Sequence, residues 1–206
     1  MPDPNSKIYP SPFSKAYWRQ ALADMKNPRV LAFSALMIAA CVALSYVPSI
    51  PVALDGGVRV TWGFLARALC GLVGGPLNAL IFGAAEDTIS FLINSKGAVY
   101  FPGYMLTTML GTFLYSIFLY RTKVTIPRIF LAKLLTNVLN VTLGALWSAI
   151  LYSKGYLYYA STSLVKNVLM LPVQTVMLCA LFSALLPVLR RSGLLPWYSQ
   201  ENIALR

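Results

Sequence analysis

The sequence contains no histidine, and only six of its 206 residues are acidic. Without histidine, Ser-His catalysis, His-ligated zinc and HExxH chemistry are excluded within this chain. No Walker A, GxSxG or dinucleotide-binding motif occurs either. The one adjacent carboxylate pair, Glu86 and Asp87, makes a poor catalytic dyad, because neighbouring helical side chains point about 100° apart. We therefore expect neither an enzyme nor a bound metal or cofactor.

Charge of either sign is scarce as well. Charged residues make up 11% of the sequence and hydrophobic residues 58%, whereas about a quarter of a soluble domain is charged. Five uncharged stretches are each about long enough to cross a ~30 Å hydrocarbon core as a helix, and no period-2 alternation indicates a barrel. They cover residues 30–54, 68–85, 97–120, 134–153 and 167–189. The sequence therefore predicts an all-α integral membrane protein.

Proline, glycine and charged residues divide the chain into six expected transmembrane helices. A tight turn is expected at Gly74-Gly75-Pro76, and the tyrosine-rich segment 152–162 is expected to be a loop at the membrane interface. The expected helices cover about 29–48, 61–74, 76–94, 104–120, 129–151 and 164–189.

A shorter helix is expected ahead of the first transmembrane helix. Apolar side chains recur there at helical spacing, among Lys15, Arg19 and Lys26. A basic amphipathic helix of this kind is typical of the membrane interface; packing on a partner protein is the alternative. We therefore expect a cytoplasmic tail and interfacial helix at 1–27, a six-helix membrane domain at 28–191, and a cytoplasmic tail at 192–206.

The distribution of basic residues predicts the orientation. Eleven Lys and Arg residues lie in the N-terminal segment, in the loop after the fourth helix and in the C-terminal segment, against three in the other loops: Arg59, Lys96 and Lys154. The positive-inside rule therefore places both termini in the cytoplasm. Membrane topology also explains the net charge of +11 without a nucleic-acid partner.

The first transmembrane helix has a ridge of small residues, Ala35, Ala39 and Ala43. Small residues four apart let another helix approach closely in lipid, where packing drives association. Such a ridge is consistent with docking on a partner subunit and equally with packing between helices of this chain.

Polar residues recur along one face of the fifth helix and continue in the sixth. In lipid such residues normally face the interior of a helix bundle or a cavity. They indicate a ligand pocket, and hydrogen bonds between helices, worth about 0.6 kcal/mol each, are the alternative. The residues are Lys133, Asn137, Asn140, Gly144, Trp147, Lys166, Asn167 and Gln174.

Three charged residues are expected at similar depth in the second and third helices. Arg67 lies opposite Glu86 and Asp87 if the Gly-Gly-Pro turn makes a tight hairpin. One carboxylate is expected to pair with Arg67. The other is then available to a ligand with neighbouring N–H donors.

With these features in place, the chain resembles the substrate-binding S components of energy-coupling factor (ECF) vitamin transporters, and most closely the folate-specific type. The resemblance covers about residues 28–190. NPRVLAFSALMIAACVAL and GGPLNALIFGAAEDTISFLI resemble several vitamin types. The folate type is indicated by YFPGYMLTTMLGTFLYSIFLYR, RIFLAKLLTNVLNVTLGALWSAILY and SLVKNVLMLPVQ. Asn78 departs from the family pattern, in which glycine is commoner.

This resemblance implies a six-helix bundle in the bacterial plasma membrane, with a vitamin pocket open to the outside. It also implies docking on a transmembrane coupling subunit carried by two ATPase subunits, which power a reorientation of the S component. The absence of a Walker A motif agrees with this division of labour.

A folate ligand suits the residues available. Its flat pterin fits aromatic faces and amides, for which we expect Phe101, Tyr104 and Trp147 to stack and Asn140 and Asn167 to bind the edge. Its glutamate is a dicarboxylate, for which Lys166, Arg59 and Lys96 are expected near the outer mouth. The alternatives are another vitamin, such as riboflavin, thiamine or a queuosine precursor, and a self-contained small-molecule channel or facilitator.

Overall fold

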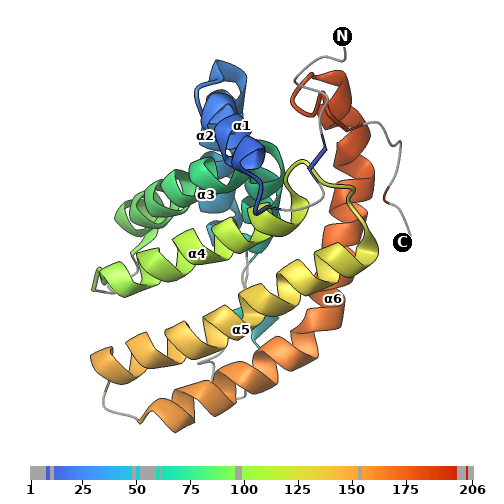
Figure 1. Cartoon of the computed structure of the whole chain (residues 1–206). Helices are drawn as coiled ribbons and strands as arrows, with labels where there is room; N and C mark the ends of the chain where they lie inside the picture. Colours follow the sequence, from blue (N-terminus) through green and yellow to red (C-terminus); the bar gives the residue numbers. More distant parts are fainter. Residues whose placement is uncertain are drawn as a thin grey trace.

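A computed structural model describes residues 8–9, 12–47, 50–51, 59–60, 62–95, 99–152, 155–198 and 203. The described part is a helical bundle (Figure 1). Two short strands, β1 (Ile50–Pro51) and β2 (Arg59–Val60), pair antiparallel between the second and third helices. The helices are α1 (Lys15–Met25), α2 (Pro28–Tyr46), α3 (Phe64–Asn94), α4 (Pro102–Leu119), α5 (Ile126–Leu151) and α6 (Tyr156–Arg191).

Four of the described helices are long and apolar enough to cross a membrane: α2, α3, α5 and α6. Large apolar side chains on these helices face outward, among them Leu36 at 61% exposure and Val176 at 68%. Contiguous exposed apolar surface of this kind is what contact with lipid requires. The expectation of an all-α membrane protein is therefore confirmed.

Prolines mark where three of the helices begin. Pro28, Pro102 and Pro127 lie in the first turns of α2, α4 and α5, where a missing N–H costs no helical hydrogen bond. The Asn27 side chain also caps α2 by accepting a hydrogen bond from the Arg29 backbone N–H at 3.0 Å. These starts lie within three residues of the expected ones.

The expected turn at Gly74-Gly75-Pro76 is a sharp break inside α3. Gly75 has φ 74° and ψ 177°, a conformation that favours glycine, and a Cβ there would lie 2.9 Å from the Tyr120 ring. The two arms of α3 thus correspond to the second and third expected helices. The first arm and the start of the second are largely buried, so this part of α3 lies at the centre of the bundle.

The start of the sixth helix was predicted wrongly. α6 begins at Tyr156 rather than about residue 164, so most of the expected 152–162 loop is helical. The hydroxyls of Ser161 and Thr162 both donate to the Tyr158 carbonyl, at 3.0 and 2.8 Å. Their polar groups are therefore satisfied within the helix, and no glycine or proline follows Gly155 until Pro172. Figure 1 shows α6 running beside α5 and then bending away.

α1 packs on the chain's own bundle instead of lying apart from it. Tyr17 and Ala21 are buried with Tyr120 in one cluster. Asp24 forms a salt bridge with the buried Arg121 at 2.9 Å and accepts a hydrogen bond from the Tyr120 hydroxyl at 2.5 Å. The apolar face of this amphipathic helix is therefore used for internal packing, and its basic residues remain exposed.

The segment after α6 returns to the bundle at the same end as α1. Leu195, Trp197 and Tyr198 are buried in the main hydrophobic cluster. This portion of the expected tail at 192–206 is therefore packed and not free. Tyr9, near the other end of the chain, donates its backbone N–H to the Arg121 carbonyl at 3.0 Å. We call this side of the bundle the α1 end.

Asn78, the residue that departs from the family pattern, ties α3 to α2. Its Nδ2 donates to Ser34 Oγ at 2.7 Å, and both residues are buried. We expect Asn78→Ala to lower the free energy of unfolding by about 1 kcal/mol, measured by thermal unfolding in detergent. Thr142→Ala, which removes an exposed hydroxyl bonded only to its own helix, is the control. Equal unfolding temperatures for the two variants would contradict the expectation.

Candidate functional site

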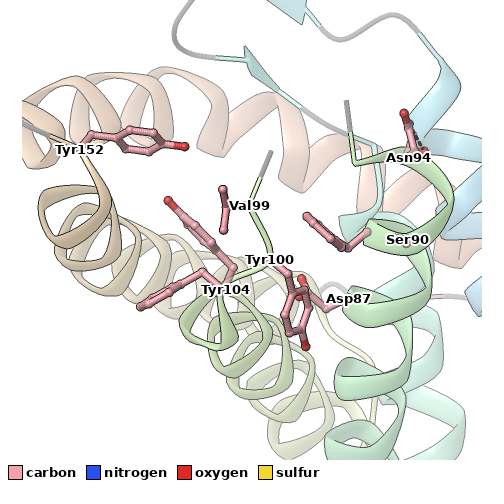
Figure 2. Close-up of a pocket in the computed structure, with 10 residues that line it drawn as sticks. Asp87, Ser90, Asn94, Val99, Tyr100, Tyr104 and Tyr152 are labelled. Atoms are coloured by element: carbon pink, nitrogen blue, oxygen red, sulfur yellow. Dashed lines mark hydrogen bonds between the residues drawn. The ribbon is translucent and has the colours of Figure 1, made fainter. Parts of the chain in front are cut away.

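A cavity of about 320 Å³ opens beside the start of α4 and the C-terminal ends of α3 and α5 (Figure 2). The start of α4 and the end of α5 lie at the end of the bundle opposite α1 (Figure 1). The cavity volume is within the range of about 300–1,000 Å³ that is usual for small-molecule sites. The lining combines aromatic rings, hydroxyl groups, an amide and a single carboxylate. The lining residues are Ser45, Asp87, Ser90, Phe91, Asn94, Val99, Tyr100, Phe101, Tyr104 and Tyr152.

Three aromatic residues predicted for the site lie together at this end. The ring centroid of Phe101 is 5.6 Å from that of Trp147 and 6.1 Å from that of Tyr104. A Cβ at Gly103 would lie 2.3 Å from Phe101 and 2.6 Å from Trp147. Only glycine therefore lets the first turn of α4 approach the rings so closely.

Hydrogen bonds hold two of these rings in place. Trp147 Nε1 donates to Thr107 Oγ1 at 2.9 Å, and the Tyr104 hydroxyl lies 3.1 Å from Ser148 Oγ. Both bonds join α4 to α5. We call Phe101, Tyr104 and Trp147 the aromatic wall. Its tyrosine and tryptophan rings are oriented before any ligand arrives, which reduces the entropy lost on binding.

The two neighbouring carboxylates have different surroundings. Glu86 is 3% exposed and forms a bidentate salt bridge with Arg67, at 3.0 and 3.1 Å. Asp87 lines the cavity and accepts a hydrogen bond from Thr108 Oγ1 at 3.0 Å. Among the described residues Asp87 forms no salt bridge. An ion pair and a carboxylate available to a ligand therefore occur side by side.

Asn140, Trp147, Lys166 and Asn167 do not line this cavity; Trp147 instead contacts Phe101, which does. Because α6 begins at Tyr156, Lys166 lies ten residues into the helix, about 15 Å along its axis, and not near the mouth as predicted. The amide of Asn167 donates to the Ser163 carbonyl at 2.8 Å, and its backbone carbonyl accepts from Asn137 at 3.3 Å. Asn140 is exposed.

The remaining predicted cations cannot be placed against the cavity. Arg59 belongs to β2, where it pairs with Pro51, and its side chain lies outside what the structure describes. Lys96 lies outside the described residues altogether.

The polar stripe predicted on the fifth helix is not a single surface. Lys133 is buried, with its Nζ 4.4 Å from the centroid of the Phe64 ring, while Trp147 belongs to the aromatic wall. Asn137 and Gln174 are also buried, and each has a side-chain oxygen without a hydrogen-bond partner in the described structure. The stripe therefore passes from the bundle interior to the cavity end.

Sequence reasoning missed most of the polar lining on α3. Ser90, Phe91 and Asn94 follow Asp87 at steps of three, four and seven residues, so the four share one face of a helix. Figure 2 shows Asp87, Ser90 and Asn94 on α3, across the cavity from Tyr104 and Tyr152. Helical spacing from Asp87 was the signal that could have identified them.

Comparison with known proteins identifies a curated protein and a solved structure that are similar to this chain. Folate transporter FolT of Clostridium novyi (strain NT) is 34% identical over 155 residues, which cover 75% of this chain and 88% of that protein. The crystal structure of FolT bound with folic acid aligns with a TM-score of 0.65 and 27% identity, over 74% of this chain and 91% of that one. No family model matches the chain. Sequence and fold thus point to the same relatives.

Proposed function

Since the chain belongs to the folate-specific S components of ECF transporters, we propose that it binds folate in the cavity opposite α1 and serves folate uptake. It is a transport protein and not an enzyme. One observation supports the site above all others. The aromatic wall of Phe101, Tyr104 and Trp147 stands at the same end of the bundle as Asp87, a carboxylate without a salt bridge in the described structure.

The chemistry of a pterin matches this arrangement. Its flat ring stacks on Phe101 and Trp147, and its amino and ring N–H groups donate to the Asp87 carboxylate, in charge-assisted bonds that are stronger than neutral ones. We assign this role to Asp87 and not to Glu86, because both Glu86 oxygens accept from Arg67. The Arg67–Glu86 pair instead supports the helix face that presents Asp87.

Asn140, Lys166 and Asn167 do not line the cavity, and we propose that they bind the part of the ligand that extends beyond it. The exposed amide of Asn140 and the side chain of Asn167 bind further polar atoms of the ligand. Lys166, half-buried on α6, and Arg59 bind the glutamate carboxylates, since cations are the natural partners of a dicarboxylate.

The proposal is tested with the purified chain alone. Folate should quench tryptophan fluorescence saturably, because it stacks at Trp147, while riboflavin and thiamine should not compete. Liposomes containing only this chain should show no folate flux. Binding of riboflavin or thiamine in preference to folate would indicate another vitamin type. Flux without the other subunits would indicate a channel or facilitator.

We also propose that the chain crosses the bacterial plasma membrane six times. The two arms of α3 supply two crossings, since the break at Gly75 lets Arg67 on one arm lie 3.0 Å from Glu86 on the other, and α2, α4, α5 and α6 supply one each. Both termini are then cytoplasmic, because the α1 end contains most of the basic residues. Contacts of Tyr9 with Arg121, and of Trp197 with the main cluster, support a common side.

Cysteine labelling tests this topology. In a chain without Cys41, Cys70 and Cys179, a membrane-impermeant maleimide added to intact cells should label Val99→Cys and Gly155→Cys, which are exposed at the cavity end. Lys123→Cys and Lys26→Cys, exposed at the α1 end, should react only after the cells are opened. The reverse pattern would show that the chain has the opposite orientation. Labelling of all four positions in intact cells would contradict the proposed topology altogether.

The partners proposed for the chain are a transmembrane coupling subunit and two ATPase subunits. Ala35, Ala39 and Ala43 are all exposed on α2, so they are not used in packing between helices of this chain. An exposed ridge of small residues favours close approach of a partner helix in lipid. We therefore assign the ridge to docking on the coupling subunit.

A further inference from the structure

Three arginines lie around the turn that follows α6 at the α1 end. Arg29 lies in the first turn of α2, and Arg190 and Arg191 end α6. The backbone N–H of Gly193 donates to the Arg190 carbonyl at 3.1 Å. A Cβ built on Gly193 would lie 3.3 Å from Arg29 Nη1. The Arg29 guanidinium is therefore held against the turn that follows the other two arginines; we call the three the arginine cluster.

The arginine cluster has no anion to balance it within the described structure. All three side chains are exposed, and none forms a salt bridge among the described residues. The one carboxylate described at this end, Asp24, is already paired with Arg121. Positive charges in one region repel one another, so an external anion would stabilise the arrangement.

Apolar surface continues from the arginine cluster along both helices. Leu36, seven residues after Arg29 and on the same helix face, is 61% exposed, and Val188, three residues before Arg191, is 57% exposed. An acidic peptide would bind the arginines but would not cover the apolar surface within the membrane. A phospholipid matches both, because its phosphate is joined to acyl chains just as the arginines adjoin the apolar surface.

We infer that the arginine cluster binds the headgroup phosphate of an anionic phospholipid, with the acyl chains along Leu36 and Val188. Arginine suits phosphate because its fork of N–H donors binds two oxygens at once. The exposed cations of α1, Lys15, Arg19 and Lys26, add attraction to an anionic surface without forming the site.

Native mass spectrometry of the full chain in detergent tests this inference, with phosphatidylglycerol as the probe and phosphatidylcholine as the zwitterionic comparison. The wild-type chain should retain one phosphatidylglycerol in preference to phosphatidylcholine. Each arginine is expected to contribute roughly fivefold to the affinity. The variant R29Q/R190Q/R191Q should therefore lose at least about tenfold, and R29Q alone about fivefold.

The matched control is K15Q/R19Q/K26Q, which removes the same charge from the same end and should change the affinity less than about threefold. Unchanged folate binding shows that each variant is folded, and R29Q remains informative if the triple variant is not. Equal losses in the two triple variants would overturn the inference in favour of a diffuse charged surface. So would no loss in either, competition by millimolar inorganic phosphate, or a loss of assembly with the coupling subunit while lipid retention is unchanged.

Discussion

Replacing Ala39 with tryptophan should abolish folate uptake by the assembled transporter, while the purified chain binds folate as tightly as the wild type does. Ala39 is the middle residue of an exposed ridge on α2 and is not among the residues that line the cavity. A partner helix can approach such a ridge closely only if its side chains are small. A tryptophan there would separate the helices and prevent docking. Uptake of labelled folate into proteoliposomes and co-purification with the coupling subunit measure the loss.

The control for this variant is Val176→Trp, on α6 and away from the ridge. Val176 is 68% exposed, so a tryptophan there meets lipid and should leave uptake unchanged. If Ala39→Trp removes folate binding and folding together, then the ridge packs within this chain. Normal uptake by Ala39→Trp would show that the coupling subunit docks elsewhere.

The helices could be predicted from the sequence where their limits depend on local chemistry. Pro28, Pro102 and Pro127 fix helix starts through their missing N–H groups, and Gly75 fixes the break in α3 through its positive φ. The start of α6 could not be predicted, because tyrosine and serine are compatible with either a helix or an interfacial loop. Only the packing of that segment decides between them.

α1 shows a second limit of the same kind. Its amphipathic pattern was predicted correctly, but the pattern does not say what covers the apolar face. In the structure Tyr120 packs against the apolar face, and the Asp24–Arg121 salt bridge holds α1 in place. Asp24 and Arg121 are 97 residues apart, so no local pattern could pair them.

The candidate site likewise has features that the sequence could predict and features that it could not. Aromatic residues at the start of α4 and the end of α5 could be assigned to one wall, because the topology brings those ends together. The sequence could not show which of Glu86 and Asp87 pairs with Arg67, since both are carboxylates and adjacent residues lie at nearly the same depth in the membrane. Only the direction of each side chain shows that Glu86 meets Arg67 and Asp87 meets the cavity.

Exchanging Lys166 for alanine should weaken folate binding roughly ten- to a hundredfold, because one charged contact with the glutamate carboxylates is lost. A pterin without the glutamate tail should bind the same variant nearly as tightly as the wild type. Asp87→Asn should behave differently and weaken both ligands, since it alters the partner of the pterin N–H groups. Isothermal titration of both ligands against both variants measures these affinities.

The two variants are controls for each other, and Lys166→Arg should retain most of the folate affinity because it keeps the charge. Lys166 lies about 15 Å along α6, next to Asn167, whose carbonyl already accepts a hydrogen bond from Asn137 on α5. A purely structural lysine at that position would hold α5 and α6 together. Equal losses of folate and pterin in Lys166→Ala would indicate that structural role. No loss of either ligand would place the glutamate tail away from α6, at the mouth near Tyr152.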